Sequence, residues 1–544
     1  MSARPGACHN CRRSRLRCDR SLPHCLKCTK AGHTCLGYGT LLRWEKGMAS
    51  RGKMVGVTSD SMLKIQKATA TSSLPAPSPA ILSTEQAPSA SSHSNPPRSL
   101  PRSLEDPSAQ DLDFRSRTYL DYFARVVCKD LVLYDTPQHN PFRDLVPMAY
   151  QKPILFQAIT ATSALRMSNA CRQLSRSSSI SASTDSPPQS STRSPSSRSI
   201  GPCLASRPEI LHDALSAKQQ ALLLLKSALE TMAPADVDAI LASVLLLIGF
   251  ELIDSGRGSW IFHINGARTI IEKLVASAVA TETTLSPLRR WLMSNCLVYD
   301  LLGSSFANSY LPHSGGLSTT TMSLLQDAEG NHCSSFPAAL LSVMQAGAQL
   351  LKMNEDFTSP DTLADSRRYG AFHLLHAAKS FDPAVWAINL QPRSPADDLF
   401  HRTEIASAHK AAVCVYLSRI ILALWPSTAL PDDLETLAAE IIVHLSCMQP
   451  RDALFTATAW PAFIAGLETA DLTNRAWVVR RFQELWELEA WGLTREALGA
   501  LTTIWDERKN ENTTESGNNM LDLQEENWNW VEKLKSVGTD WLVA

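Results

Sequence analysis

The side chains best suited to chemistry lie together near the N-terminus. Residues 8 to 35 read CHNCRRSRLRCDRSLPHCLKCTKAGHTC and hold six of the 13 cysteines in the chain. The spacing is C-x2-C-x6-C, and it repeats after 17 residues, giving the set Cys8, Cys11, Cys18, Cys25, Cys28 and Cys35. Cysteines at this density bind metal, form disulfides or act as a redox pair, so these three chemistries must be compared.

The spacing favours a site for two zinc ions. Each half offers three thiolates, one fewer than the four ligands of tetrahedral zinc. Two ions need eight ligand contacts, which six thiolates supply only when two of them bridge both metals. The repeat suggests one bridging cysteine from each half, and Cys8 and Cys25 occupy equivalent positions. Because thiolates complete the ligand count, we expect His9 and His33 to be surface or phosphate-facing residues.

The two competing chemistries fit less well. A thioredoxin-like site needs one C-x2-C pair at the start of a helix in a βαβ setting, and no strand-like pattern surrounds either pair. Disulfides need an oxidising compartment, and the start MSARPGACHNCRRSR shows neither a signal-peptide core nor a myristoylation pattern. The apolar run at 239–250 has 12 residues, short of the ~18 needed to span a bilayer. We therefore expect a buried helix there, no membrane partner, and zinc as the cofactor.

Charge separates the N-terminal segment from the rest of the chain. Residues 1–53 carry a net charge of +10, whereas the remaining residues carry −11 and the whole chain −1. A small basic module on an acidic body favours a polyanionic partner, with nucleic acid ahead of anionic lipid. The arginines and lysines can also offset the net −2 charge of six thiolates and two Zn²⁺ ions.

The elements that follow are predicted to be helical. Residues 54–110 are rich in Ser and Pro and predict a disordered linker, and a Ser-rich tract predicts a disordered insertion at 172–207. Helical periodicity is clear in two segments, whose predicted apolar faces are Leu222, Leu225, Leu229 and Met232, and Val478, Phe482, Leu485 and Trp486. The predicted fold class is mostly α, with a helical domain over 111–544.

One further motif predicts close helix packing. In GSWIFHINGARTIIEKL, the small pair Gly266 and Ala267 follows Trp260 and His263. We expect the pair to admit a neighbouring helix and His263 to be a satisfied core histidine. No G-x-S-x-G, H-E-x-x-H, P-loop or dinucleotide motif occurs in the sequence, so we expect no enzyme activity.

The cysteine segment resembles the Zn(II)2Cys6 binuclear cluster of fungal transcription factors. The resemblance rests on the six spacings, on CRRSRLRCD, and on Pro23 ahead of the fourth cysteine. It implies that Cys8 and Cys25 bridge the metals and that the first helix enters the major groove. It also implies a CGG-like target read from the position of Arg15, where the family usually has lysine. Ser14 replaces a residue that is often basic.

The remaining basic residues are predicted to contact phosphate. The resemblance makes Arg15 the predicted base contact, and arginine can pair with guanine O6 and N7. Phosphate contacts supply affinity without sequence information, and we assign them to Arg12, Arg13, Arg17, Arg20, Lys27 and Lys30. The tail LGYGTLLRWEKGMASRGKM resembles that of regulators related to acriflavine-sensitivity control proteins. No sustained heptad repeat follows Cys35, which leaves open whether a homodimer binds paired half-sites.

The rest of the chain resembles the fungal-specific transcription factor domain. The segments LDYFARVVCKDLVLYD and NPFRDLVPMAYQKPILFQAITATSALRM carry this resemblance within 111–544. Together the resemblances imply a nuclear, sequence-specific regulator of RNA polymerase II genes, with double-stranded DNA and the transcription machinery or coactivators as partners. Control of a secondary-metabolite gene cluster is the expected pathway. The alternatives are a zinc module that docks a protein and a redox or metal sensor.

Overall fold

The structure is a computed structural model of the chain, which divides into two compact units, 1–101 and 102–544. It describes residues 8, 11, 17–19, 21, 25–31, 35, 112–136, 139–181, 207–281, 283–307, 317–353, 361–514, 529–536 and 540–544. The predicted linker at 54–110 lies outside these residues. Within them, the regular elements are helices, joined by two isolated β-bridges, Val132 to His332 and Arg257 to Trp541. This confirms the predicted mostly α fold class.

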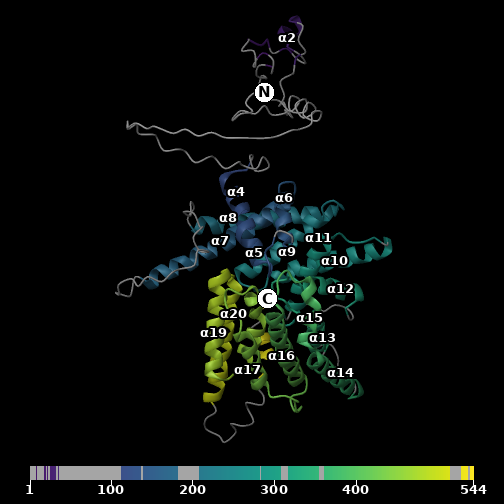
Figure 1. Cartoon of the computed structure of the whole chain (residues 1–544), viewed down its shortest axis with the longest axis vertical. Helices are drawn as coiled ribbons and strands as arrows, with labels where there is room; N and C mark the ends of the chain where they lie inside the picture. Colours follow the sequence, from purple (N-terminus) through teal and green to yellow (C-terminus); the bar gives the residue numbers. More distant parts are fainter. Residues whose placement is uncertain are drawn as a thin grey trace, which may run out of the picture. The chain divides into compact units, whose positions relative to one another are not determined.

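The first unit contributes one described helix, and the second contributes the rest (Figure 1). Their bounds are α2 Leu26–Lys30, α4 Phe114–Tyr122, π-helix η2 Phe123–Val127, α5 Cys128–Asp130, 3-10 helix η3 Pro141–Asp144, α6 Leu145–Ala149, α7 Pro153–Ser181, α8 Arg207–Thr231, α9 Val237–Asp254, α10 Trp260–Thr281, α11 Pro287–Ser304, α12 Thr319–Ala328, α13 Ala338–Met353, α14 Asp361–Ser380, α15 Pro383–Leu390, 3-10 helix η5 Gln391–Arg393, α16 Leu399–Leu424, α17 Leu434–Ser446, 3-10 helix η6 Ala453–Thr458, α18 Ala459–Glu468, α19 Leu472–Glu489, α20 Gly492–Thr514 and α22 Trp530–Ser536.

Short polar side chains fix where many of these helices begin. Asp113, Ser286, Ser318, Asp382, Asp433 and Asp471 each accept a hydrogen bond from a backbone N–H in the first turn of the helix that follows. The first-turn N–H groups have no partner inside the helix, so such a cap stabilises the start by about 1 kcal/mol. Pro287 and Pro383 strengthen two of these starts because the first helical position needs no N–H donor.

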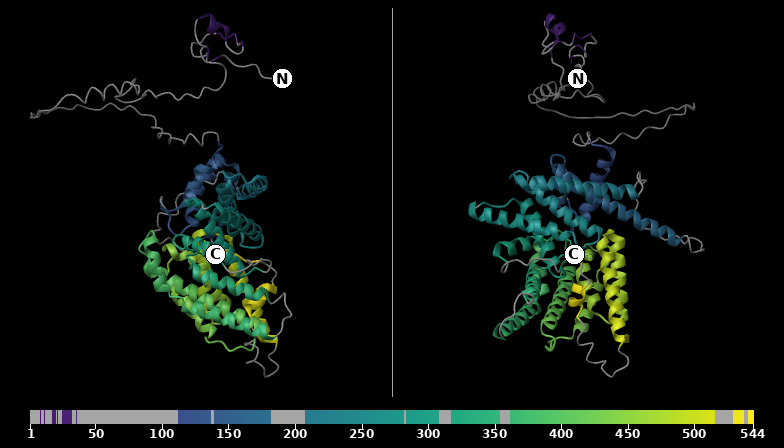
Figure 2. Two further views of the ribbon diagram at one scale, coloured as in Figure 1. Left: turned by 90° about the vertical axis from the view of Figure 1, so that its right-hand side faces the viewer. Right: turned by 180° about the vertical axis from the view of Figure 1, so that it is seen from behind.

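Helix α9 forms the centre of the core and confirms the prediction of a buried helix at 239–250. Every residue from 239 to 253 is buried. A helix that is apolar on all sides must be surrounded, and α9 contacts α7, α10, α11 and α20. Figure 2 shows α7 and α8 paired at one end of the helical unit, with the later helices forming a bundle beyond them.

Helix α16 is long and apolar enough to span a membrane, but it is a core helix of this fold. Its most apolar stretch is 83% buried inside the protein. Its charged side chains have protein partners: Arg402 Nε donates to Asp398 Oδ2 at 2.8 Å, and Arg419 Nε donates to Glu468 Oε2 at 2.8 Å. Buried charges paired in this way belong to a protein interior, where helices α13, α14, α15, α17 and α18 contact α16.

The predicted apolar face of α8 is wrong in part. Leu225 is buried, but Leu222 and Leu229 are 39% and 40% exposed. The buried face consists of Ile210, Ala214, Ala217, Ala221 and Leu225. Small alanines let α8 approach α7 closely, and the larger leucines are thereby turned toward the surface. In α19, by contrast, the predicted Val478, Phe482 and Leu485 are buried and Trp486 is half-buried, which confirms that face.

The predicted insertion at 172–207 is also partly wrong, because α7 continues through its first ten residues to Ser181. The serine-rich composition gave no sign of this extension. Gln173 holds the first turn of this extension, because its side-chain Nε2 donates to the backbone carbonyl of Trp486 in α19. Cys171, Arg172 and Gln173 are half-buried, so this turn of α7 still packs on the domain. Residues 182–206 lie outside the described residues.

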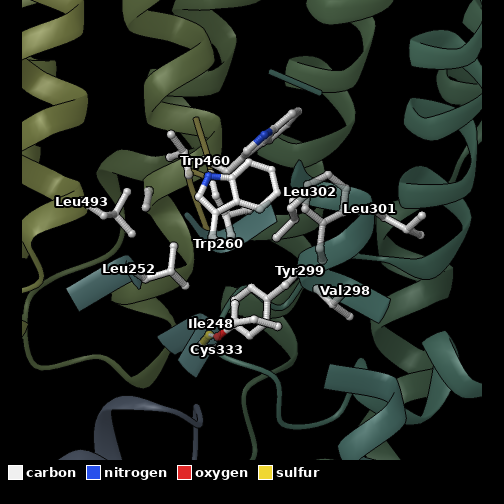
Figure 3. Close-up of a cluster of buried hydrophobic side chains, with 14 of the residues drawn as sticks. Ile248, Leu252, Trp260, Val298, Tyr299, Leu301, Leu302, Cys333, Trp460 and Leu493 are labelled. Atoms are coloured by element: carbon white, nitrogen blue, oxygen red, sulfur yellow. Dashed lines mark hydrogen bonds between the residues drawn. The ribbon is translucent and has the colours of Figure 1, made fainter. Parts of the chain in front are cut away.

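The tight contact between α10 and α11 is not at Gly266, where we expected a neighbouring helix. A Cβ atom at Gly266 would meet nothing within 4 Å, so no helix approaches there. The close approach occurs at Gly303 in α11, which lies against the ring of Trp260. That ring is fully buried in the hydrophobic cluster of Figure 3. His263 is a satisfied core histidine as expected: its Nε2 lies 3.2 Å from Oε1 of Glu251, a buried carboxylate that also pairs with Lys218.

Candidate metal centre and nucleic-acid interface

The six predicted ligands come together in the first unit. Cys8, Cys11, Cys25, Cys28 and Cys35 are buried, and Cys18 packs against them. Sγ of Cys8 lies 3.7 Å from Sγ of Cys28, and Sγ of Cys11 lies 3.6 Å from Sγ of Cys25 and 3.9 Å from Sγ of Cys28. The short sulfur contacts therefore join one half of the repeat to the other.

The two halves also use the same backbone contacts. The N–H of Cys8 donates to Sγ of Cys18 at 3.3 Å, and the N–H of Cys25 donates to Sγ of Cys35 at 3.4 Å. Residues 8 and 25 are equivalent in the 17-residue repeat, as are 18 and 35. The sequence repeat is thus also a repeat of local geometry.

The sulfur spacing fits zinc and does not fit disulfides. Sulfurs on a tetrahedral zinc lie about 3.8 Å apart when the zinc–sulfur bonds are about 2.3 Å long. The separation of Cys8 from Cys28, 3.7 Å, and that of Cys11 from Cys25, 3.6 Å, lie close to that value. A disulfide would bring two sulfurs to about 2.05 Å. Sγ atoms of Cys8, Cys11, Cys25 and Cys28 all lie within 4.8 Å of one another, so these four can share metal ions.

Asp19 connects the cluster to α2, a role that the sequence analysis missed. Its Oδ1 accepts from Sγ of Cys25 at 2.9 Å and from the N–H of Lys27 at 3.1 Å, and its Oδ2 accepts from the N–H of Leu26 at 3.0 Å. An anion at a helix start satisfies N–H groups that have no helical partner. Asp19 directly follows Cys18 in the sequence, and this Cys-Asp pair was the available signal.

The protonation of the thiols follows from their surroundings. The hydrogen bond to Asp19 raises the pKa of Cys25 to about 12, and burial adds to that rise. Burial is also the main cause of the raised pKa of Cys11 and of Cys28. The hydrogen bonds from Cys25 and Ser21 hold the pKa of Asp19 well below its usual range. Without metal these three thiols therefore keep their protons, and zinc must displace those protons to bind.

Three of the seven predicted DNA-contacting residues are described, and all three are exposed. Arg17 directly precedes Cys18, and Lys27 and Lys30 stand three residues apart on α2. Their positive charges are accessible to phosphate. Arg12, Arg13, Arg15 and Arg20 lie outside the described residues, so their predicted roles stay predictions. The metal ligands and the basic residues interleave in sequence.

Comparison with known proteins agrees with this arrangement in both units. Residues 6–45 match the model of the fungal Zn(2)-Cys(6) binuclear cluster domain, and residues 118–544 match the fungal specific transcription factor domain. The cluster family implies two zinc ions. The chain is 29% identical over 616 residues to acriflavine sensitivity control protein acr-2 of Neurospora crassa, covering 99% of this chain and 97% of that protein. No solved structure matches the chain. The chain belongs to the fungal Zn2Cys6 transcription factor family, as a zinc-dependent DNA-binding regulator.

Proposed function

We propose that the protein is a nuclear transcription factor that reads a CGG-like half-site in the major groove. In this proposal Cys8 and Cys25 bridge two zinc ions, Arg15 contacts a guanine, and Arg12, Arg13, Arg17, Arg20, Lys27 and Lys30 contact phosphate. The observation that carries it is the buried cysteine cluster, whose sulfur separations suit zinc, in a segment of net charge +10. The zinc ions have a structural role, because they hold the basic segment between Cys11 and Cys18.

The exposed charges support separate roles for residues that give affinity and residues that read the sequence. Each lysine or arginine that neutralises a phosphate releases counterions from DNA, which gives affinity without specificity. Lys27 and Lys30 are exposed on a helix anchored through Asp19, so they suit this part. A bidentate arginine–guanine pair contributes about 1 to 3 kcal/mol of discrimination, which suits Arg15.

Binding of the full, zinc-loaded chain to a CGG-containing duplex and to a scrambled duplex tests the proposal. Arg15→Ala should reduce the preference between the duplexes by about tenfold or more. Lys27→Ala should weaken binding to both duplexes alike and reduce the slope of log affinity against log salt by about 1. Arg125→Ala removes an exposed charge from the helical unit and serves as the control. Equal losses on both duplexes for Arg15→Ala would contradict base reading by Arg15.

The target genes form the second part of the proposal. We place the protein at promoters transcribed by RNA polymerase II, within a secondary-metabolite gene cluster. The name of the Neurospora relative refers to control of acriflavine sensitivity. Genome-wide mapping of bound sites, combined with fluorescence localisation, tests both location and pathway. Target genes grouped in a biosynthetic cluster would support the proposal. Target genes confined to resistance to toxic compounds would contradict it. Paired half-sites would indicate that two copies bind together.

A further inference from the structure

The helical unit contains a polar cavity of about 160 Å³ at the C-terminal end of α17. Residues of the loop after α17 and of one side of α19 form its walls. The lining includes Ser446, Gln449, Trp477, Arg480, Arg481 and Glu484. Three of these six are charged, although the buried residues of α19 other than Arg481 are all apolar.

Arg481 is the unusual member of this cavity. Its side chain is only 5% exposed, yet its nearest carboxylate oxygen, Oε2 of Glu484, lies 3.6 Å from Nε, beyond hydrogen-bond distance. Nη2 donates to the backbone carbonyls of Leu445 and Met448, at 3.1 and 3.2 Å. Nε and Nη1 are buried and have no hydrogen-bond partner among the described residues. The guanidinium therefore keeps unused N–H donors beside a polar space.

Two aromatic rings hold this guanidinium in place. Its central carbon lies 4.5 Å from the ring centre of Phe455 and 4.7 Å from that of Trp477. Contacts with ring faces are favourable for a cation, but they satisfy no N–H group. Burial lowers the pKa of Arg481 to about 10, so the group is still charged at neutral pH. A buried cation with unpaired donors is costly unless an acceptor reaches it.

We propose that this cavity binds a small oxyanion, either a phosphate or a short carboxylate, whose oxygen accepts a hydrogen bond from Nη1 of Arg481. Arg480 adds a second positive charge to the lining, and Glu484 contributes one negative charge, so the lining carries a net charge of +1. The side-chain amide of Gln449 offers a neutral donor. Such a ligand would act as an effector of the helical unit, separate from the zinc cluster.

Size restricts the ligand. Pockets that take drug-sized molecules measure about 300 to 1,000 Å³, well above this cavity, so a nucleotide or an aromatic dye would not fit. Liquid water occupies about 30 Å³ per molecule, and several waters would fill the space in the absence of ligand. A phosphate or a three- to four-carbon acid is of suitable size. The net positive lining also disfavours organic cations.

Isothermal titration calorimetry on the full, zinc-loaded chain tests the proposal. Inorganic phosphate and malonate are titrated separately at constant ionic strength, with tetramethylammonium chloride as the cation control. Arg481 itself holds the end of α17, so the test relies on two residues that line the cavity and are not buried. Arg480→Gln should weaken binding by about threefold, and Glu484→Gln should tighten it by about threefold, typical for charges near solvent.

Two matched controls separate this site from others. Arg125→Gln removes an exposed charge far along the sequence, and Lys27→Gln removes one from the basic N-terminal unit, where phosphate could also bind. Neither should change the affinity of the cavity. Binding of phosphate alone, malonate alone or both would identify the oxyanion. Absence of binding by both, or binding that Arg480→Gln and Glu484→Gln leave unchanged, would overturn the proposal and leave Arg481 hydrated by water only.

Discussion

Replacement of Gly303 by alanine should destabilise the helical unit, although alanine is the better helix former. A Cβ atom at position 303 would lie 2.5 Å from Cζ3 and 2.6 Å from Cη2 of Trp260. Nonbonded carbons pack at about 3.5 to 4.0 Å, so the ring would have to move by about 1 Å. The ring has no free space, because Trp260 is fully buried and its Nε1 donates to the backbone carbonyl of Asp540 at 3.3 Å.

The size of the effect follows from two opposing terms. Overpacking of a filled core costs about 1 to 3 kcal/mol, and a rigid indole places this site at the upper end. Replacing glycine by alanine inside a helix contributes about 1 kcal/mol in the other direction. The net loss for Gly303→Ala is therefore about 2 kcal/mol. Gly266→Ala in α10 is the matched control, because its Cβ meets nothing within 4 Å, and only the gain of about 1 kcal/mol applies.

Urea unfolding of the zinc-loaded chain, followed by tryptophan fluorescence and by far-ultraviolet circular dichroism, measures both variants. The midpoints should move in opposite directions at an unchanged slope, and the two free energies of unfolding should differ by about 3 kcal/mol. If Gly303→Ala proved as stable as Gly266→Ala, the proximity of Trp260 to α11 would be wrong.

Three further predictions concern protons and metal. Burial lowers the pKa of His332 and of His409 to about 3, whereas an unfolded histidine titrates near 6.5. The unfolded chain thus binds more protons below pH 6.5, so stability is complete above that pH and falls by about 2 kcal/mol per histidine at pH 5. Urea midpoints at pH 7.5 and 5 measure this, and His409→Gln should reduce the loss. Asp19→Asn should lower zinc affinity by about tenfold in competition with a chromophoric chelator; unchanged affinity would refute its supporting role. Removal of zinc by a chelator should abolish DNA binding but leave the circular dichroism of the helical unit intact, because the candidate metal-binding groups in the described residues lie within 8–28. Parallel loss of the helical signal would contradict this.

The parts of the fold that could be predicted from sequence are those set by local patterns. The repeat of cysteines predicts a cluster because metal geometry fixes which spacings work. The unbroken apolar run in α9 predicts burial because no face of that helix can be left in water. Val478, Phe482 and Leu485 likewise mark a buried face of α19.

Other features depend on which helices meet, and periodicity alone does not determine that. Leu222 and Leu229 share a face with Leu225, but the alanines of α8 allow a closer approach to α7 and so decide its orientation. Gly303 is an ordinary helical glycine in the sequence, and only the position of Trp260 gives it a function. Arg481 falls on the buried face of α19, and a charge at such a position was a signal for a specific environment.

The exchange of contacts between the two cysteine repeats has a consequence for how the first unit responds to metal supply. Cys8 meets Cys28, and Cys11 meets Cys25, so neither repeat brings four sulfurs together by itself. Binding of the first zinc ion requires both repeats to be folded against each other. That arrangement also brings together the sulfurs that bind the second ion. Loading should therefore be cooperative. Occupancy of DNA would then change steeply over a narrow range of free zinc, and a singly loaded species would be scarce.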